Sequence, residues 1–262
     1  MLIMHYADSG NLHNYLQTNF INITWNKKLD ILWNISLGLN CIHEKNFIHR
    51  DFHSGNILLS EEKTNYIDYQ SWFVGDLGLS QPANNALNND IYGVIPYIAP
   101  EVFKDVAFSK EADIYSMGMI MWELTTGCKP FANVEHDVNL IYEIIDGKRP
   151  EITEDTPKCF ANLMKRCWDS DPLKRPSIFE IEETVNNWIL YNENFYNQQN
   201  NNDIIEQFKK AEIKRLELIQ SEKLGPEFNE KSHPGAIYTS RPLSILISNS
   251  SSTISLQGMY YI

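Results

Sequence analysis

The residues whose types could do chemistry lie in two short polar stretches. The first reads His49-Arg50-Asp51-Phe52-His53-Ser54-Gly55-Asn56, and the second reads Gly75-Asp76-Leu77-Gly78. The alternation of His49, Asp51 and His53 is compatible with a zinc or di-metal hydrolase site, although no further cluster of ligand residues accompanies it. Asp51 and Asn56 could also be turn-forming residues of an ordinary loop. The residue types alone leave these interpretations open.

Short apolar runs and helical patterns surround these stretches. Phe47-Ile48 and Ile57-Leu58-Leu59 predict two small strands that bracket the first stretch, which would then be a loop held by a scaffold. Apolar spacing of three to four residues predicts helices elsewhere. The expected helices cover residues 12–16, 25–42, 112–126, 140–145, 160–168 and 178–190. The fold class is therefore mainly α.

The composition changes near residue 190, which indicates a boundary. We expect one domain over residues 1–189 and a tail over 190–262. An Asn- and Gln-rich linker opens the tail, and a helix with mixed charge follows at about 204–222. Ser248 to Ser252 is low in complexity and predicts a disordered end. The helix has a weak apolar stripe, so a solvated extension is favoured, with docking of a regulatory partner as the alternative.

Charge and cysteine usage limit the class of partner and the compartment. The chain has 22 Lys and Arg against 34 Asp and Glu, a net charge of -12, which repels phosphate backbones and anionic membranes. We therefore expect no nucleic acid and no membrane partner, also because no apolar run approaches the ~18 residues of a membrane span. The four cysteines form no CxxC pair, which favours a reducing, cytoplasmic location.

Five motifs in order carry a resemblance to a known family. His49-Arg50-Asp51 with Asn56 matches HRDxxxxN, and Asp76-Leu77-Gly78 matches DFG with Leu in place of Phe. Downstream follow Ala99-Pro100-Glu101, Asp113 to Gly118, and Cys167-Trp168 with Arg175-Pro176. The chain resembles the large lobe of eukaryotic protein kinases. The resemblance implies a mainly α lobe with short strands around a catalytic loop, followed by a helical and disordered tail.

The resemblance also implies a reaction and its residues. ATP and Mg²⁺ would be the cofactors, and the γ-phosphate would pass to hydroxyls of protein substrates in intracellular signalling. Asp51 would accept or orient the proton of the attacking hydroxyl. Asp76 and Asn56 would hold Mg²⁺ through a carboxylate and a neutral amide oxygen. These three residues form the expected catalytic set.

The first residues resemble the hinge of the kinase fold. Met4 would occupy the gatekeeper place, backbone groups of His5 and Ala7 would meet the adenine edge, and Leu58 would form the floor beneath the ring. A short edge strand and turn is the alternative. Because nothing precedes Met1, we expect the small lobe to be missing, together with its Gly-rich phosphate loop and its lysine. Activity of this chain alone is then doubtful.

The substrate class rests on departures from two patterns. Serine/threonine kinases usually have Lys where His53 stands and Thr where Val94 stands, and tyrosine kinases usually have Arg at the place of His53 or Gly55. The form HRDFHSGN is closer to the tyrosine-kinase-like branch, which favours Ser/Thr over Tyr as acceptor. The competing hypothesis is a catalytically inactive scaffold or decoy that binds partners through a kinase-like lobe.

Three further residues have structural roles implied by the resemblance. Glu101 and Arg175 match a buried ion pair that joins the activation segment to the late helices. Asp113 matches an aspartate that binds the catalytic-loop backbone, with a helix N-cap as the alternative or additional role. His49 is expected as a packed core residue beside Leu77.

Overall fold

The protein is described from a computed structural model that covers residues 7–63, 68–83, 91–192, 202–225, 232–244 and 246. Its helices are α1 (Leu12–Asn19), α2 (Trp25–Glu44), α3 (Lys110–Thr126), α4 (Val138–Ile145), α5 (Lys158–Cys167), α6 (Ile178–Asn192) and α7 (Asn202–Gln220). Its strands are β1 (Phe47–Ile48), β2 (Ile57–Lys63), β3 (Asp68–Val74), β4 (Gln81–Pro82), β5 (Tyr92–Gly93) and β6 (Arg241–Pro242). The mainly α fold class is confirmed.

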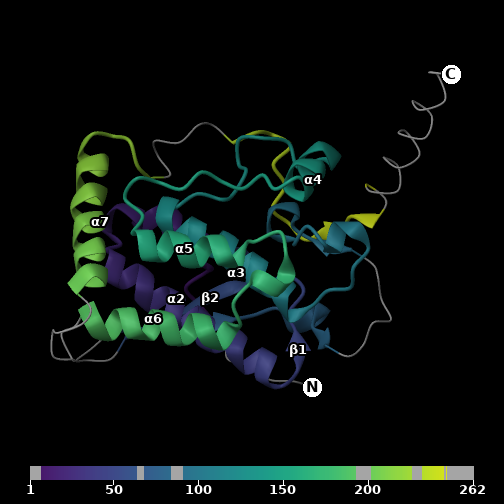
Figure 1. The fold of residues 1–262 in the computed structure, drawn as a ribbon, viewed down its shortest axis with the longest axis horizontal. Coiled ribbons are helices and arrows are strands. Elements are labelled where there is room, and N and C mark those ends of the chain that lie inside the picture. Colours follow the sequence, from purple (N-terminus) through teal and green to yellow (C-terminus); the bar gives the residue numbers. More distant parts are fainter. Residues whose placement is uncertain are drawn as a thin grey trace.

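Helix α3 lies at the centre of the lobe, between α2 and α5 (Figure 1). It is buried on nearly all sides, which explains why its sequence is apolar around the whole circumference. The Ser109 side chain accepts from the Ala112 amide at the N-cap, and Gly127 ends the helix with φ of 73°. A residue other than glycine would be strained there. The helix end predicted at residue 126 is confirmed.

Short antiparallel pairs hold the polar loops in place. β1 pairs with β4, so the entry to the first polar stretch is tied to the segment that follows the second. β2 pairs with β3, and Ile57 lies opposite Val74. The two polar stretches therefore begin and end on paired strands. β3 was not among the expected elements. Its polar residues Asp68, Gln70 and Ser71 interrupt the apolar alternation that predicts a strand, and its pairing with β2 stabilises the strand instead.

The tail helix α7 packs against the lobe, contrary to the expected solvated extension. Phe208 is 3% exposed and meets the Trp25 ring at 5.9 Å between centroids. Arg215 is 2% exposed and donates to the carbonyl of Ile21 at 2.9 Å, while Glu212 accepts from the Trp25 amide at 3.0 Å. The weak apolar stripe of the helix did not indicate this docking, because polar side chains, Arg215 and Glu212, also contribute to the interface.

A buried lysine lies beneath this interface. Lys28 is fully buried, with its ammonium 4.7 Å from the centre of the Phe20 ring and 4.6 Å from that of Trp25. Burial lowers the pKa of Lys28 to about 8, although the nearby charge of Asp155 acts in the opposite direction. The aromatic faces and Asp155 thus compensate in part for the water that Lys28 loses on folding.

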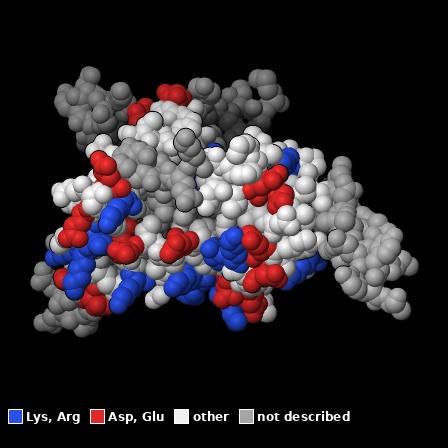
Figure 2. All heavy atoms as spheres, turned by 90° about the horizontal axis from the view of Figure 1, so that it is seen from above, with Lys and Arg blue, Asp and Glu red and all other residues white. Residues whose placement is uncertain are grey.

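The surface mixes both signs of charge. On the face shown in Figure 2, basic and acidic side chains of the described residues are interleaved. Over the part of the chain that the structure describes, no helix is both long enough and apolar enough to cross a membrane.

We expect Phe208→Ala to lower the free energy of unfolding by about 3 kcal/mol, because it removes a buried aromatic ring from the contact with Trp25. Ile213→Ala is the matched control on the same helix, since Ile213 is 59% exposed. It should change the stability by less than about 0.5 kcal/mol. Urea denaturation followed by tryptophan fluorescence measures both. Equal effects of the two substitutions would contradict a docked α7.

Candidate active site

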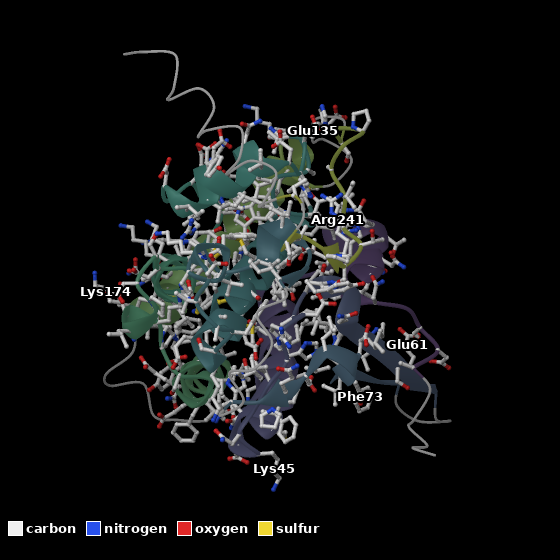
Figure 3. All side chains as sticks on the ribbon, turned by 90° about the vertical axis from the view of Figure 1, so that its right-hand side faces the viewer. Lys45, Glu61, Phe73, Glu135, Lys174 and Arg241 are labelled. Carbon is white, nitrogen blue, oxygen red and sulfur yellow. The ribbon has the colours of Figure 1, made fainter. Side chains whose placement is uncertain are left out.

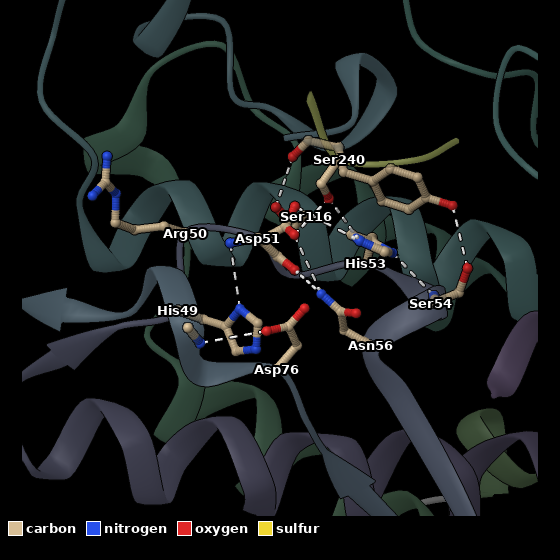
Figure 4. Close-up of polar contacts among 12 residues, drawn as sticks. His49, Arg50, Asp51, His53, Ser54, Asn56, Asp76, Ser116 and Ser240 are labelled. Carbon is tan, nitrogen blue, oxygen red and sulfur yellow. Dashed lines mark hydrogen bonds and ion pairs between the residues drawn. The ribbon is translucent and has the colours of Figure 1, made fainter. Parts of the chain in front are cut away.

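Asp51 lies at the centre of the candidate site, in the loop between β1 and β2 (Figure 4). It is 6% exposed. Its Oδ2 accepts from the Asn56 side chain at 3.4 Å, and Asn56 also donates to the Asp51 carbonyl at 2.9 Å. The amide nitrogen of Asn56 is thus committed to Asp51, which leaves its amide oxygen as the group that can face a cation.

Asp76 comes from the second polar stretch and lies beside Asn56 and His49 in Figure 4. Its backbone is left-handed, with φ of 55°, and its side chain is exposed and accepts from the Gly78 amide at 3.4 Å. A carboxylate oxygen and an amide oxygen are ligands that Mg²⁺ prefers, and Mg²⁺ commonly takes its remaining ligands from phosphates and water. The two residues therefore fit the predicted cation.

A histidine joins the two polar stretches. His49 is fully buried; its Nδ1 accepts from the Asp51 amide at 3.3 Å, so its Nε2 carries the proton and donates to the Gly75 carbonyl at 2.9 Å. Its ring also meets the edge of Phe52, with centroids 5.5 Å apart. The packed core role is confirmed, but these are its contacts rather than the expected Leu77, which is 45% exposed.

Asp113 fixes the loop that carries Asp51. It lies inside α3 and is 1% exposed; its carboxylate accepts from the amides of His49 at 2.8 Å and Arg50 at 3.0 Å. The ring of His43 lies 2.9 Å from the same carboxylate. Arg50 has φ of 72°, a strained conformation for this residue, and its hydrogen bond to Asp113 helps to hold it. The loop-binding role of Asp113 is confirmed, whereas Ser109 is the N-cap, so that alternative is wrong.

His53 is a residue whose function the sequence did not indicate. Its Nδ1 accepts from the Gly55 amide at 3.1 Å, so in the neutral ring Nε2 is the donor. Nε2 lies 3.7 Å from Asp51 Oδ1 and 3.4 Å from Ser240 Oγ. The only sequence signal was its place two residues after Asp51, which is where serine/threonine kinases have a cationic side chain.

The surroundings of Asp51 set its ionisation. Burial acts to raise the pKa of Asp51, but the hydrogen bond and charge of His53 and the hydrogen bond from Ser240 outweigh burial, so the pKa lies below its ordinary value. Asp51 is therefore an ionised acceptor at neutral pH.

A residue of the tail reaches the same carboxylate. Ser240 Oγ donates to Asp51 Oδ2 at 2.5 Å. Nothing in the sequence marked Ser240, because its proximity to Asp51 depends on the pairing of β6 with β5, which joins Gly93 to Arg241, 148 positions apart, and Tyr92 to Pro242, 150 positions apart. No local pattern encodes a contact of this kind.

The hinge residues are only partly described. Met4 and His5 lie outside the described residues, so their contacts with adenine remain predictions. Leu58 is half-buried, and its side chain lies so close to Gly75 that a Cβ there would be 2.8 Å from it. The amide of Ser9 donates to the carbonyl of Leu59 at 3.1 Å, which sets the segment after Ala7 beside β2. Asn11, a few residues after Ala7, pairs with Leu58, and the contacts of Ala7 and Leu58 with adenine stay predictions.

The predicted ion pair between Glu101 and Arg175 is confirmed. The guanidinium donates to both carboxylate oxygens, at 2.6 and 2.7 Å, and also to the carbonyls of Asp169 and Glu111. All charged atoms thus have partners although both residues are buried. The pair ties the segment that follows Gly93 to the start of α6.

The zinc or di-metal interpretation has no support from the arrangement of ligands. Within the described residues, no three or more His, Cys, Asp or Glu side chains are grouped so that they could hold a metal ion. His49 and His53 turn their ring nitrogens to protein partners instead.

Asp51, Asn56 and Asp76 thus lie close together in a mainly helical lobe, as their motifs in the sequence predict. Residues 1–185 match the family described as protein tyrosine and serine/threonine kinase. The chain belongs to this family.

Relatives carry names of the same kind. A protein of Acanthamoeba polyphaga mimivirus whose name assigns it to the serine/threonine-protein kinases/receptors, R831, is 31% identical over 70% of this chain and 11% of its own length. Two Dictyostelium discoideum proteins named as probable serine/threonine-protein kinases, DDB_G0282963 and drkD, are 27% and 30% identical over 78% and 69% of the chain. The match covers only 12% and 14% of those two proteins.

We expect Asp113→Asn to loosen the catalytic loop, because the amide cannot accept as strongly from the His49 and Arg50 backbone as a carboxylate does. Amide hydrogen exchange at these two residues should accelerate roughly ten- to a hundredfold. Glu111→Gln, an exposed change in the first turn of the same helix, is the control and should leave their exchange unaltered. Unchanged exchange in Asp113→Asn would show that another contact holds the loop.

Proposed function

We propose that the chain carries the catalytic lobe of an ATP- and Mg²⁺-dependent protein kinase that phosphorylates Ser or Thr in preference to Tyr, in cytoplasmic signalling. The observation that carries the proposal is the ionised Asp51 beside Asn56 and Asp76, three side chains from two separate loops. Phosphoryl transfer asks a protein mainly for positioning and charge neutralisation, which this arrangement can supply.

The proposed reaction follows from these positions. The acceptor hydroxyl oxygen forms a bond to the γ-phosphorus of ATP, the bond from that phosphorus to the bridging oxygen breaks, and ADP leaves. Asp51 takes the hydroxyl proton. Asn56 and Asp76 would hold Mg²⁺, which neutralises charge on the phosphates. Asp113 keeps the Asp51 loop in place throughout, and His53 directs its Nε2–H toward Asp51 and the acceptor oxygen.

The acceptor preference is supported by two observations. Relatives over this region are named serine/threonine kinases. In addition, a short serine side chain, that of Ser240, reaches Asp51 from a strand paired with β5. A tyrosine on the same backbone would carry its hydroxyl well past the carboxylate. The nucleotide side, with Met4, His5, Ala7 and Leu58 around adenine, stays a prediction.

We expect Asp51→Asn and Asp76→Asn each to lower kcat by at least about a hundredfold, because one removes the proton acceptor and the other a cation ligand. The measurement is phosphate transfer from ATP to casein, by the 262-residue chain and by the same chain extended at its N-terminus with the small lobe of a related kinase. Asp146→Asn, an exposed change at the end of α4, is the control.

Near-normal turnover by either variant would contradict the role given to that residue. Absence of transfer by both wild-type forms, together with a normal fold, would instead favour the inactive scaffold.

His53 provides a separate test of acceptor positioning. We expect His53→Ala to lower kcat/KM for the protein substrate about ten- to a hundredfold while the KM for ATP stays unchanged, because only the acceptor side loses a donor. His53→Lys should recover most of the loss, since an ammonium can donate from the same position. Equal loss in both variants would indicate a role in loop packing rather than in acceptor positioning.

A further inference from the structure

The tail crosses the molecule to reach the candidate active site. In Figure 1 the helix α7 lies at one end of the lobe, while β6 lies at the other end, near α4. Figure 3 shows Arg241 and Glu135 on the same end of the molecule, and Lys174 away from it. We call residues 232–244 the tail segment. It lies beside Asp51 and β5 on one side and beside the loop that precedes α4 on the other.

One side of the tail segment adds a strand to β5. Gly93 lies opposite Arg241, and the Leu243 amide donates to the carbonyl of Ile91 at 2.8 Å. The Leu243 side chain is 1% exposed. Addition of an extended strand to a free edge is a common way for a protein to bind a peptide, in which backbone hydrogen bonds give affinity and side-chain pockets give specificity.

The other side of the tail segment is held by the loop before α4. His136 donates its amide to the carbonyl of Gly235 at 3.0 Å, and its Nδ1 lies 2.9 Å from the carbonyl of Ile237. Tyr238 donates to the carbonyl of Pro130 at 2.8 Å, and Arg241 donates to the carbonyl of His136 at 2.8 Å. Contacts therefore hold the backbone on both sides of Ser240.

This path brings the strand as close to Asp51 as the backbone allows. Gly93 has φ of 144°, and a Cβ at this position would lie 3.2 Å from Ile98 and 3.4 Å from Asp51 Oδ1. The absence of a side chain at Gly93 leaves room beside the carboxylate. Ser240, next to the partner of Gly93 in the ladder, fills that room: its hydroxyl donates to Asp51 at 2.5 Å and lies 3.4 Å from His53 Nε2.

We propose that the tail segment is a substrate of this chain's own active site and that Ser240 is the hydroxyl that receives the phosphate. The proposal rests on the proposed kinase function and adds the acceptor. The Ser240 oxygen forms the bond to the γ-phosphorus of ATP, the bond to the bridging oxygen breaks, ADP leaves, and the hydroxyl proton passes to Asp51.

Phosphorylation of Ser240 would favour release of the tail segment from Asp51. Phosphorylated Ser240 carries a charge of about -1.5 to -2 and would lie against the ionised Asp51. Repulsion between the two groups, both largely removed from solvent, opposes the strand pairing with β5. Before transfer, by contrast, the chain connection holds the segment at a high effective concentration near the site, so acceptors on other proteins must compete with it.

The acceptor role is tested with the chain extended by the small lobe of a related kinase. After incubation with Mg²⁺ and ATP, mass spectrometry should find phosphate on Ser240, with a rate that does not depend on protein concentration, because the reaction is intramolecular. Ser240→Ala should remove this phosphate. Thr239→Ala is the matched control, since Thr239 is the neighbouring hydroxyl and is exposed; it should leave the phosphate in place.

Casein added to the same reaction distinguishes failure of the acceptor role of Ser240 from failure of the proposed kinase function. Phosphate on casein without phosphate on Ser240 would overturn the acceptor role and leave the kinase function intact. Phosphate on neither would overturn the proposed function, and the acceptor role with it.

Docking of the segment is tested without nucleotide on the 262-residue chain. The Leu243 amide should be protected from hydrogen exchange, and Ser240→Glu, which sets a carboxylate against Asp51, should accelerate its exchange at least about tenfold. Thr239→Glu should not. An unprotected Leu243 amide in the wild-type chain would overturn the proposal whatever the activity.

Discussion

The site depends on a single buried carboxylate that never needs to touch substrate. Asp113 accepts the backbone amides of His49 and Arg50 and lies beside the ring of His43. A carboxylate has about four lone-pair positions and can therefore accept several hydrogen bonds at once. In this way Asp113 can hold a loop whose backbone is strained at Arg50. Because α3 is surrounded by other elements, the carboxylate is itself immobile. The position of Asp51 therefore depends on Asp113 and, through it, on the buried helix α3.

A second network of the same kind holds the segment between Gly93 and α3. Glu101 and Arg175 hold the end of the activation segment through paired hydrogen bonds. Nearby, Tyr97 donates to the buried carboxylate of Glu123, and Ser116 donates to the carbonyl of Tyr97 at 2.7 Å. Burial and the negative charge of Glu123 raise the pKa of Tyr97 well above its usual range, so it stays a donor. These contacts hold the segment that follows β5, the strand that pairs with the tail segment.

What could be predicted from the sequence was local. Asp51, Asn56 and Asp76 stand in short motifs whose spacing survives without any knowledge of the fold, and α3 has the apolar content of a central helix. The contacts of Ser240 with Asp51 and His53 could not be predicted, because they join segments that are far apart in the sequence. β3 lacks a clear alternation, and the docking of α7 depends on the buried Arg215 as much as on Phe208. Polar contacts between segments that are distant in the sequence produce no repeating pattern of apolar residues from which they could be predicted.

The composition boundary near residue 190 does not coincide with a physical boundary. Trp25, at the start of α2, meets Phe160 of α5 at 5.2 Å and Phe208 of α7 at 5.9 Å between ring centroids. Trp188 of α6 meets Phe208 at 5.7 Å. A chain cut after residue 189 would expose these rings and the ammonium group of Lys28 to water. The same cut would remove the tail segment from Asp51. The residues after α6 thus complete the aromatic core at one end of the lobe and contact Asp51 at the other.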